Sequence, residues 1–364
     1  MKSIQVIKSL NRGGAEALLY SYFKYFGGKD HMLCVLSGNR LEMLDAFDQL
    51  GIKPVVFNVF DNGFSFPEYL RFLKFVAEHR TGYVFHSHLP LAGVVLRSAK
   101  LFFSFKSVYT EHNVIRMYHP VTSFLNSATY FLENQIIACS SLVGESIPRL
   151  FASRVITVQN GVDTNRFSFV NSLDKWSLLA SKGEIRMICI AGFREEKNHL
   201  LLLNVIRILV LKDFNVQLKL IGDGLRRPDL ESYVFANNLQ EFVFFEGFQS
   251  DVYPYLVWAN FFCLTSNYEG LPVSLLEAMS AGCIPVCSNV GGISEVYKSD
   301  FFPLINLTNN FDSDADLFVA SMLDILTLSC DDLFAKSKYA SYIIHEFFNI
   351  EIMMTKLVGV YKKV

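Results

Sequence analysis

Short apolar runs of strand length alternate with helix-like segments along almost the whole chain. Strand-like runs stand at residues 4–9, 32–37 and 54–58, and helix-like segments separate them. Strands that alternate with helices are typical of βαβ units, which assemble into a parallel sheet with helices on its faces. The alternation continues to about residue 160 and resumes at residue 185, so the sequence predicts an α/β fold with two doubly wound domains.

A turn sequence, Asn160-Gly161-Val162-Asp163, and the polar stretch 171–183 interrupt this alternation. A chain of 364 residues is also too long for one ordinary core. The last segment carries apolar residues at helical spacing. We therefore predict a first domain over residues 1–165, a linker over 166–184, a second domain over 185–345 and a terminal helix over 346–364.

The charge balance argues against a nucleic-acid-binding protein, because 33 Lys and Arg face 35 Asp and Glu. No apolar stretch reaches the ~20 residues that span a bilayer, and the N-terminus reads as a strand, so we expect a cytoplasmic protein. Two segments, 69–76 and 97–106, mix bulky apolar with basic residues. Core packing is favoured for the first, whereas the second is equally compatible with core packing and with peripheral contact at the anionic inner face of the cytoplasmic membrane.

The seven cysteines are scattered and mostly lie in apolar runs, which predicts buried, reduced thiols. Cys283 and Cys287 have no second Cys/His pair at metal-ligand spacing. The sequence therefore predicts neither a metal site nor a cofactor.

Two glutamates, Glu269 and Glu277, lie on either side of a loop-to-helix junction between two strand-like runs. Pro272 suits the first helical position, and Gly282 suits the residue after the helix end. Glu269 is then expected on the loop and Glu277 on the helix. At this edge of a parallel sheet, the N–H groups of a helix start suit a phosphate.

The segment resembles the E-(seven residues)-E signature of retaining GT-B glycosyltransferases of the family 4 type, in the polysaccharide-assembly branch. Gly270, Leu271 and Ala278 match as well, as does the downstream pair Gly291-Gly292. The resemblance implies two Rossmann-like domains facing across a cleft. It further implies that the first domain serves the acceptor, that the second binds a nucleotide sugar, and that the terminal helix packs back on the first domain.

The same resemblance assigns roles to the signature. It places Glu269 beside the donor sugar and Glu277 on the nucleotide ribose. It gives the amides of Gly270 and Leu271, with the helix start at Pro272, to the sugar and diphosphate. Without the resemblance, the favoured reading is that Glu269 is a solvated loop residue and Glu277 an exposed helix residue.

A charged loop, residues 191–199, follows the first strand of the second domain. A cation suits this position, because departure of a nucleoside diphosphate develops negative charge there. The loop resembles the donor loop of the family, in which a lysine and an arginine grip the diphosphate. Lys197 matches the lysine. Gly192 stands where the arginine is usual, and Arg194, two residues later, is the candidate replacement.

Two further loops of the first domain resemble those of the family. The string containing Gly13 and Gly14 follows the first strand, where glycines permit close backbone approach or a positive φ. By the resemblance it faces the donor phosphates and the acceptor. His88, at the end of a strand, matches a histidine near the transferred sugar, and an imidazole can bond a hydroxyl there. His86 is expected in the core.

The next strand ends in Thr110-Glu111-His112-Asn113 and is followed by Arg116. We assign His112, Asn113 and Arg116 provisionally to the acceptor. No residue is an obvious nucleophile. The family implies front-face attack assisted by the leaving phosphate.

The resemblance implies a retaining, metal-independent transfer of a hexose from a nucleoside diphosphate sugar, with UDP favoured, to an acceptor hydroxyl. The expected acceptor is a lipid-linked glycan in bacterial surface-polysaccharide synthesis, such as O-antigen or lipopolysaccharide. Two alternatives remain open. One is a non-transferase GT-B enzyme such as a sugar-nucleotide epimerase, and the other is a degenerate sugar-nucleotide-binding partner protein.

Overall fold

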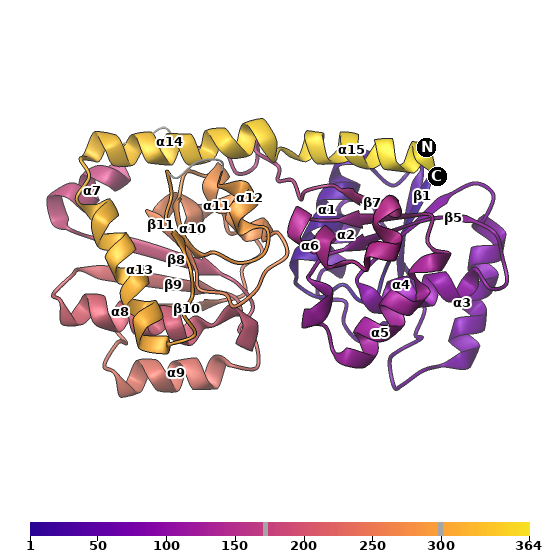
Figure 1. Ribbon diagram of the computed structural model, residues 1–364, viewed down its shortest axis with the longest axis horizontal. Coiled ribbons are helices and arrows are strands. Elements are labelled where there is room, and N and C mark those ends of the chain that lie inside the picture. The colour runs from indigo at the N-terminus through magenta and orange to yellow at the C-terminus, as the bar shows by residue number, and fades with distance from the viewer. Residues whose placement is uncertain (170–173, 298–300) are drawn as a thin grey trace. The chain divides into compact units, whose positions relative to one another are not determined.

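The computed structural model describes residues 1–169, 174–297 and 301–364 (Figure 1). The chain divides into two compact units. The first comprises Met1–Gly161 and Ile350–Val364, and the second comprises Val162–Asn349. Each unit contains one parallel sheet covered by helices, which is the α/β architecture that the alternating sequence predicts.

The first sheet has seven parallel strands in the order β3-β2-β1-β4-β5-β6-β7. Strand β1 is buried along its whole length, since helices cover both faces of the sheet. The strand order reverses between β1 and β4, so the loops after these two strands lie at the topological switch point. The strands are β1 (Ser3–Ile7), β2 (His31–Val35), β3 (Val55–Val56), β4 (Val84–His88), β5 (Lys106–Glu111), β6 (Gln135–Ala138) and β7 (Val155–Thr157).

Two hydrophobic clusters bury the two faces of this sheet. One cluster joins the sheet to α1, α2 and α15 through Phe23, Phe47 and Met354. The other joins it to α3 and α4 through Phe72 and Leu96. The helices of the first unit are α1 (Gly14–Phe26), α2 (Leu44–Gln49), α3 (Phe66–His79), α4 (Pro90–Ala99), α5 (Pro120–Thr129), α6 (Ser141–Ser146) and α15 (Ile350–Lys363), with 3₁₀ turns η1 (Ile115–Met117), η2 (Tyr130–Leu132) and η3 (Arg149–Arg154).

Helix α15 ends the chain and belongs to the first unit. Its apolar residues recur at helical spacing, and Met354, Leu357 and Tyr361 are buried in the core. The Tyr361 hydroxyl accepts a hydrogen bond from Gln5 Nε2 at 3.0 Å and lies 2.7 Å from His86 Nδ1. The last helix therefore completes both the apolar and the polar packing of the first unit.

The second sheet has six parallel strands in the order β10-β9-β8-β11-β12-β13. Its order reverses between β8 and β11, which places the loops after these two strands at the switch point of this unit. The strands are β8 (Ile185–Ile190), β9 (Val216–Ile221), β10 (Val243–Gly247), β11 (Phe261–Leu264), β12 (Ile284–Ser288) and β13 (Leu304–Ile305).

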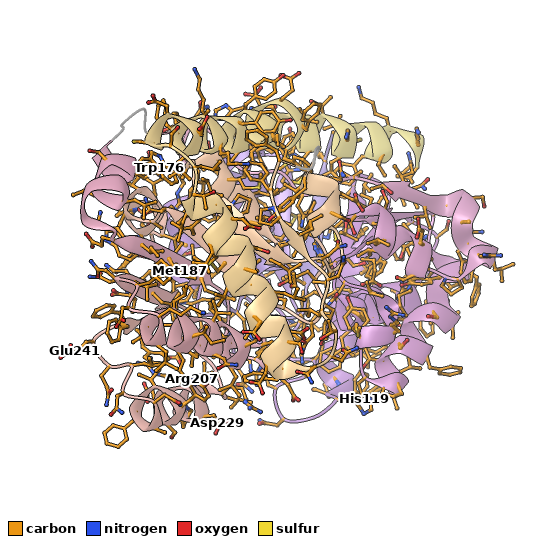
Figure 2. The ribbon with its side chains drawn as sticks, turned by 60° about the vertical axis from the view of Figure 1, so that its left-hand side comes forward. His119, Trp176, Met187, Arg207, Asp229 and Glu241 are labelled. Atoms are coloured by element: carbon orange, nitrogen blue, oxygen red, sulfur yellow. The ribbon has the colours of Figure 1, made fainter. Side chains whose placement is uncertain are left out.

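The helices of the second unit pack on this sheet and on one another, α13 against α8 and α14 against α11. Trp176 of α7 is completely buried, and its ring centroid lies 6.3 Å from that of Phe261 on β11 (Figure 2). The helices are α7 (Asp174–Lys182), α8 (His199–Leu211), α9 (Arg227–Ala236), α10 (Tyr253–Trp258), α11 (Val273–Ser280), α12 (Ile293–Val296), α13 (Phe311–Leu326) and α14 (Cys330–Phe347), with the 3₁₀ turn η4 (Glu195–Lys197).

The interval read as a linker, 166–184, contains the helix α7, which packs against α14. Its Trp176 belongs to the core of the second unit, so that part of the interval is not a linker. Residues 170–173 of the interval lie outside the described residues. A polar composition concealed this helix, because only one face of it needs to be apolar.

Candidate functional site

The switch point of the second sheet brings together the loop after β8 and the loop after β11. Backbone and side-chain hydrogen bonds join the two loops. Asn267 N–H donates to the Glu196 carbonyl at 2.8 Å, and the Thr265 hydroxyl donates to the Asn198 carbonyl at 2.9 Å. The residues that sequence analysis selects on the two loops are therefore held in one fixed arrangement.

The central contact of this arrangement is an ion pair between Lys197 and Glu269. Lys197 Nζ lies 2.6 Å from Glu269 Oε1 and 2.7 Å from Oε2. The Ser266 hydroxyl donates a further hydrogen bond to Glu269 Oε1 at 2.7 Å. The Glu269 side chain is 6% exposed and that of Lys197 is 18% exposed. The pair thus presents a cation and an anion side by side in a largely desolvated place.

The backbone of Glu269 and Gly270 is supported from behind by the loop that contains Gly291 and Gly292. Gly292 N–H donates to the Gly270 carbonyl at 2.6 Å. Gly291 has φ +57°, and a Cβ at this position would lie 1.9 Å from the Glu269 carbonyl oxygen. Only glycine permits this close approach.

Helix α11 begins at Val273, directly after this loop, so Pro272 is its N-cap rather than its first helical residue. Gly282 follows the helix end with φ +85°, as its position in the sequence predicts. Glu277 lies on α11, and its carboxylate makes no hydrogen bond within the part of the chain that the structure describes. Burial raises the pKa of Glu277 to about 7, and the nearby Arg166 guanidinium partly opposes this rise. Arg166 itself pairs with Asp251 at 3.2 Å.

Arg194 is largely exposed and lies 3.4 Å from Glu196 Oε1. Its guanidinium passes over Gly192: a Cβ on that glycine would lie 3.4 Å from Arg194 Nε. The Arg194 guanidinium therefore lies next to the space that a side chain at position 192 would occupy. Arg194 thus brings a positive charge to the same part of the loop from a backbone position two residues later.

In the first unit, Gly13 is the N-cap of α1 and Gly14 its first residue. Gly13 has an extended backbone with φ −149°, so close approach rather than a positive φ explains it. A Cβ on Gly13 would lie 2.6 Å from the Glu16 Oε2 atom. The carboxylate of Glu16 is thereby folded against the loop after β1.

His88 ends β4, but it is buried and both of its ring nitrogens have partners. Gln5 uses its amide Nε2 to donate to Ser3 and Tyr361, so its Oε1 accepts from His88 Nε2 at 2.9 Å. His88 Nδ1 is then the acceptor, and His112 Nε2 donates to it across 3.2 Å. Both ring nitrogens of His88 therefore already have protein partners, and its role beside the transferred sugar stays a prediction.

His112 is the more exposed of the two histidines, and its Nδ1 has no hydrogen-bond partner among residues 1–169, 174–297 and 301–364. Burial lowers the pKa of His112 to about 4, and burial beside two other imidazoles holds the pKa of His88 well below its usual value. Both rings are neutral at pH 7. His86 lies in the core, as expected, bonded to Tyr361 and Thr110.

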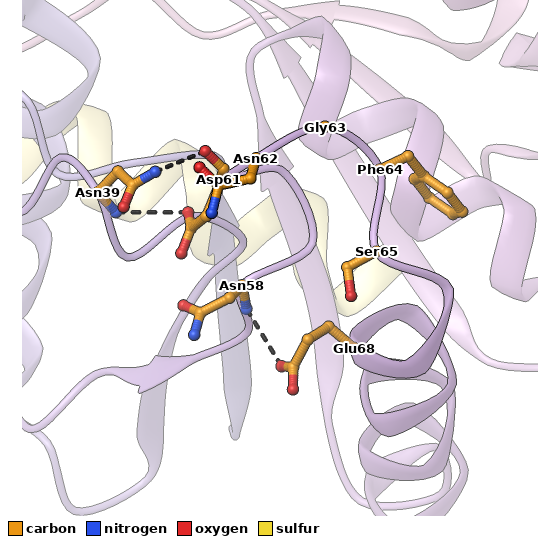
Figure 3. A pocket seen from close by; sticks show the side chains of 8 residues that line it. All are labelled: Asn39, Asn58, Asp61, Asn62, Gly63, Phe64, Ser65 and Glu68. Carbon is orange, nitrogen blue, oxygen red and sulfur yellow. Dashed lines mark hydrogen bonds between the residues drawn. The ribbon is translucent and has the colours of Figure 1, made fainter.

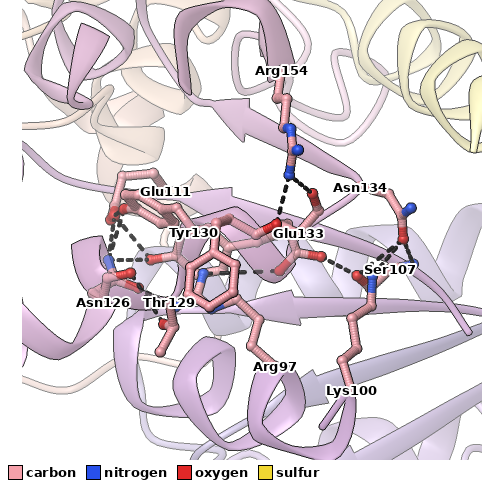
Figure 4. A network of polar contacts seen from close by, with 12 residues as sticks. Arg97, Lys100, Ser107, Glu111, Asn126, Thr129, Tyr130, Glu133, Asn134 and Arg154 are labelled. Carbon is pink, nitrogen blue, oxygen red and sulfur yellow. Dashed lines mark hydrogen bonds and ion pairs between the residues drawn. The ribbon is translucent and has the colours of Figure 1, made fainter. Parts of the chain in front are cut away.

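Asn113 and Arg116 follow His112 on the loop that runs through η1. The Asn113 side chain accepts from Val114 N–H at 2.9 Å, and Arg116 is exposed. This loop is anchored by Glu111, whose buried carboxylate accepts hydrogen bonds from four side chains. The donors are Tyr109, Tyr118, Asn126 and Tyr130. Figure 4 shows two of these donors, Asn126 and Tyr130, beside Glu111.

The buried network of Figure 4 also contains Arg97, which is fully buried. Arg97 Nη2 donates to Asn126 Oδ1 at 2.5 Å, and Nη1 lies 3.8 Å from Glu133 Oε2. The rings of Tyr109 and Tyr130 lie within 5.0 Å of its guanidinium carbon. Arg97 therefore cannot contact lipid, which corrects the expectation that it belongs to a basic membrane-facing segment.

Sequence reasoning did not single out Ser266, Arg166 or Asp251. Ser266 could have been predicted from the sequence, because it follows a buried strand and precedes Glu269 by three residues. Arg166 reaches α11 only through the fold, since it lies in the interval that reads as a linker.

Comparison with known proteins agrees with this architecture in both units. Residues 12–166 match the model of the family described as Glycosyltransferase Family 4. Residues 171–329 match the model described as Glycosyl transferases group 1. Together the two matches cover most of the chain.

Several individual proteins are similar to the chain. It is 26% identical over 324 residues to the "Capsular polysaccharide biosynthesis glycosyltransferase CapH" of Staphylococcus aureus, a match that covers 84% of the chain and 86% of that protein. It is 26% identical over 187 residues to the "UDP-Gal:alpha-D-GlcNAc-diphosphoundecaprenol alpha-1,3-galactosyltransferase" of Escherichia coli, covering 49% of the chain and 48% of that protein.

Solved structures confirm the GT-B fold. The structure of Anabaena Alr3699/HepE in complex with UDP-glucose superposes with a TM-score of 0.84 over 100% of both chains, at 16% identity. The lipopolysaccharide outer core galactosyltransferase WaaB superposes with a TM-score of 0.71 over 100% of both chains, at 15% identity.

Proposed function

The chain belongs to the group 1 and family 4 glycosyltransferases, which use nucleotide-sugar donors, and from this premise we propose a specific reaction. The protein transfers a hexose from a UDP-sugar to a hydroxyl of a lipid-linked glycan, with retention of anomeric configuration. The product belongs to a bacterial surface polysaccharide. No metal ion takes part in this proposed reaction.

The observation that carries the donor assignment is the Lys197–Glu269 pair at the start of α11. A helix start offers free N–H groups and a partial positive charge, and the Lys197 ammonium adds a full charge. The diphosphate is assigned to this place, where both features stabilise the charge that develops as the nucleotide leaves. The Gly270 and Leu271 amides and Pro272 belong to the same cradle.

Within this proposal the two glutamates have different tasks. Glu277 accepts hydrogen bonds from the ribose hydroxyls, which its carboxylate can do because no protein donor described here occupies it. Glu269 orients the transferred sugar while Lys197 shares its charge between this carboxylate and the diphosphate. Arg194 is assigned a supporting role on the phosphates, since its guanidinium crosses the Gly192 position.

For the acceptor side of the first unit, the free Nδ1 of His112 is the imidazole atom available to a hydroxyl. His88 fixes the tautomer of His112 from behind, as a second partner commonly does for a functional histidine. Asn113 and Arg116 extend the same loop. Gly13 and Gly14 are assigned to the substrate-facing loop at the switch point of the first sheet.

The names of similar proteins support UDP and a polyprenyl diphosphate as parts of the substrates. The E. coli relative named above is a UDP-Gal enzyme acting on a diphosphoundecaprenol, and a Campylobacter jejuni relative, 30% identical over 118 residues, also has a diphospho-undecaprenol in its name. A lipid-linked acceptor places the reaction at the membrane. Among the described residues, no helix combines the length and apolar character needed to cross a membrane.

Peripheral contact is therefore proposed, through the loop between α4 and β5. Leu101 and Phe102 of this loop are largely exposed, and Lys106, the first residue of β5, is exposed as well. Apolar insertion and attraction to anionic lipid would act together there. Replacing Phe102 by Ser should lower co-sedimentation with anionic liposomes without altering turnover of a water-soluble acceptor analogue, and unchanged co-sedimentation would remove this loop from the proposal.

The experiment that tests the proposed reaction is a donor screen followed by turnover. UDP, GDP and dTDP sugars are compared for thermal stabilisation, because a ligand that binds only the native state raises its melting temperature. Radiolabelled donor is then incubated with polyprenyl-diphosphate-linked glycans, and the anomeric configuration of the product is read by NMR. Sugar interconversion without acceptor would point to an epimerase, and donor binding without nucleotide release would point to a binding partner.

A further inference from the structure

A cavity of the first unit lies at the carboxyl ends of β2 and β3, away from His112. Figure 3 shows its lining, and its volume is about 320 Å³. Five lining residues carry amide or carboxylate groups, and Phe64 forms part of its wall. The lining residues are Asn39, Asn58, Asp61, Asn62, Gly63, Phe64, Ser65 and Glu68.

The loops that form this pocket are fixed by their own hydrogen bonds. Asp61 Oδ1 accepts from the Ser37 hydroxyl at 2.6 Å and from Gly38 N–H at 2.9 Å. Asn39 Nδ2 donates to the Asp61 carbonyl at 2.6 Å, which joins the loop after β2 to the loop after β3. The cavity is therefore preformed rather than a gap between loose segments.

Several polar groups of the lining remain unused. The side chains of Asn58, Asn62 and Ser65 make no hydrogen bond to any residue within the described ranges. The hydrogen bonds to Asp61 and Glu68 fall on Oδ1 and Oε2, which leaves Asp61 Oδ2 and Glu68 Oε1 available as acceptors in the described part of the chain. Donors and acceptors thus both face one cavity.

This mixture of groups selects the chemistry of a ligand. An anion is disfavoured, because two carboxylates line the cavity and, in the described part of the chain, only Glu68 has a cationic partner, Arg71 at 2.7 Å. A small cation would use acceptors alone and would not fill the cavity, whereas the amides of Asn58 and Asn62 also donate. A hydroxyl both donates and accepts. An uncharged polyhydroxylated ligand, that is, a sugar, satisfies the whole lining.

We propose that this pocket binds an uncharged sugar unit of the acceptor glycan, remote from the hydroxyl that reacts. The inference rests on the proposed function and specifies, in addition, the minimum length of the acceptor glycan. All strands of the first sheet are parallel, so the pocket and His112 lie at the same edge. Strand β2 is three places from β5 in the sheet, about 15 Å at the usual strand spacing. A ligand that reaches both is an oligosaccharide rather than a single sugar.

Direct binding tests the proposal without turnover. The full chain is titrated with uncharged oligosaccharides of glucose, galactose and N-acetylglucosamine, with saturation-transfer NMR and calorimetry as readouts. The double variant Asn58→Ala/Asn62→Ala removes two exposed side chains that have no described partner in the protein, so the fold is retained. We expect at least one oligosaccharide to bind and the variant to bind it about tenfold more weakly, the loss expected from two neutral hydrogen bonds.

The matched control is Ser104→Ala, an exposed polar residue in the loop before β5, at the opposite edge of the sheet. It should leave saccharide binding unchanged. The proposal is overturned if no saccharide binds, if the double variant binds as tightly as the wild type, or if Ca²⁺ alone occupies the pocket. UDP binding is measured in parallel: a chain that binds saccharide at the pocket but no nucleotide would refute the proposed function and leave the pocket assignment standing.

Discussion

Lys197 Nζ lies within 2.7 Å of both carboxylate oxygens of Glu269, so the cation and the anion assigned to the donor already neutralise each other. Neither side chain is therefore an isolated charge before substrate binds. A diphosphate that approaches Lys197 must share its ammonium with Glu269. The pair therefore connects diphosphate binding with the orientation of the carboxylate assigned to the sugar.

The first prediction concerns Lys197→Ala. It should weaken UDP binding about 10- to 100-fold, the value of a charged hydrogen bond, while uridine binding changes less than about threefold. Calorimetry with both ligands checks this. Lys212→Ala, at an exposed position just after the end of α8, is the control and should bind both ligands normally. Equal losses for UDP and uridine would remove Lys197 from the diphosphate site.

The second prediction separates the two glutamates. Glu269→Gln should lower turnover by more than tenfold with a small change in UDP affinity, whereas Glu277→Ala should mainly weaken UDP binding. Initial rates and calorimetric affinities measured on the same samples check this. Wild-type behaviour of both variants would refute the assignment of the signature.

The third prediction concerns pH and Glu277, whose pKa burial raises to about 7. The folded state then holds the proton more tightly than the unfolded state, whose pKa is near 4.5. The stability that this group contributes is fully present below pH about 4.5 and is lost as the pH rises through 7. Glu277→Gln should therefore gain thermal stability relative to the wild type between pH 5 and pH 8. UDP affinity of the wild type should rise over the same interval, because ribose hydroxyls need the ionised acceptor, and a parallel rise in the Gln variant would contradict this.

The fourth prediction uses Gly291, whose added Cβ would collide with the Glu269 carbonyl. Gly291→Ala should displace the Glu269–Gly270 loop and lower both stability and UDP affinity. Gly51→Ala is the matched control, since Gly51 also has a positive φ, +72°, but nothing within 4 Å of an added Cβ. The control should cost about 1 kcal/mol from backbone strain alone and leave UDP binding intact. Urea unfolding and calorimetry distinguish the two effects.

The fifth prediction follows from the burial of Arg97. Arg97→Gln should destabilise the first unit by about 3–5 kcal/mol, because it leaves the Glu133 carboxylate buried without its cation. Lys106→Gln, at an exposed position, should change stability by less than about 0.5 kcal/mol. Urea unfolding checks both. A stable Arg97→Gln variant would mean that the buried network is held by its tyrosines and Asn126.

The α/β alternation was readable from the sequence because central strands such as β1, β11 and β12 are buried on both faces and therefore read as continuous apolar runs. The placement of Glu269 on a loop and Glu277 on a helix could be predicted, because a proline and a glycine mark the two ends of the helix. The partners of these residues were not readable, because Lys197 and Glu269 are 72 positions apart and meet only through the strand order. The sequence indicated their proximity only indirectly, because both residues lie on loops at the switch point of the sheet.

His88 and Arg97 show which features of the site could not be predicted from the sequence. A histidine at a strand end and an arginine in an apolar segment both look available in sequence. Burial of a polar side chain depends on distant partners, here Gln5 for His88 and Glu133 for Arg97. Such partners lie far away in the sequence, and no local pattern identifies them.

The contribution of α15 to the first unit has a consequence for synthesis on the ribosome. Residues 1–161 leave the ribosome before Tyr361, which bonds Gln5 and contacts His86. The whole second unit is made between these two parts of the first unit. Until α15 is available, the first unit has an uncovered apolar face, and Gln5 and His86 lack the Tyr361 hydroxyl. The first unit can therefore complete its native packing only after the second unit has been synthesised.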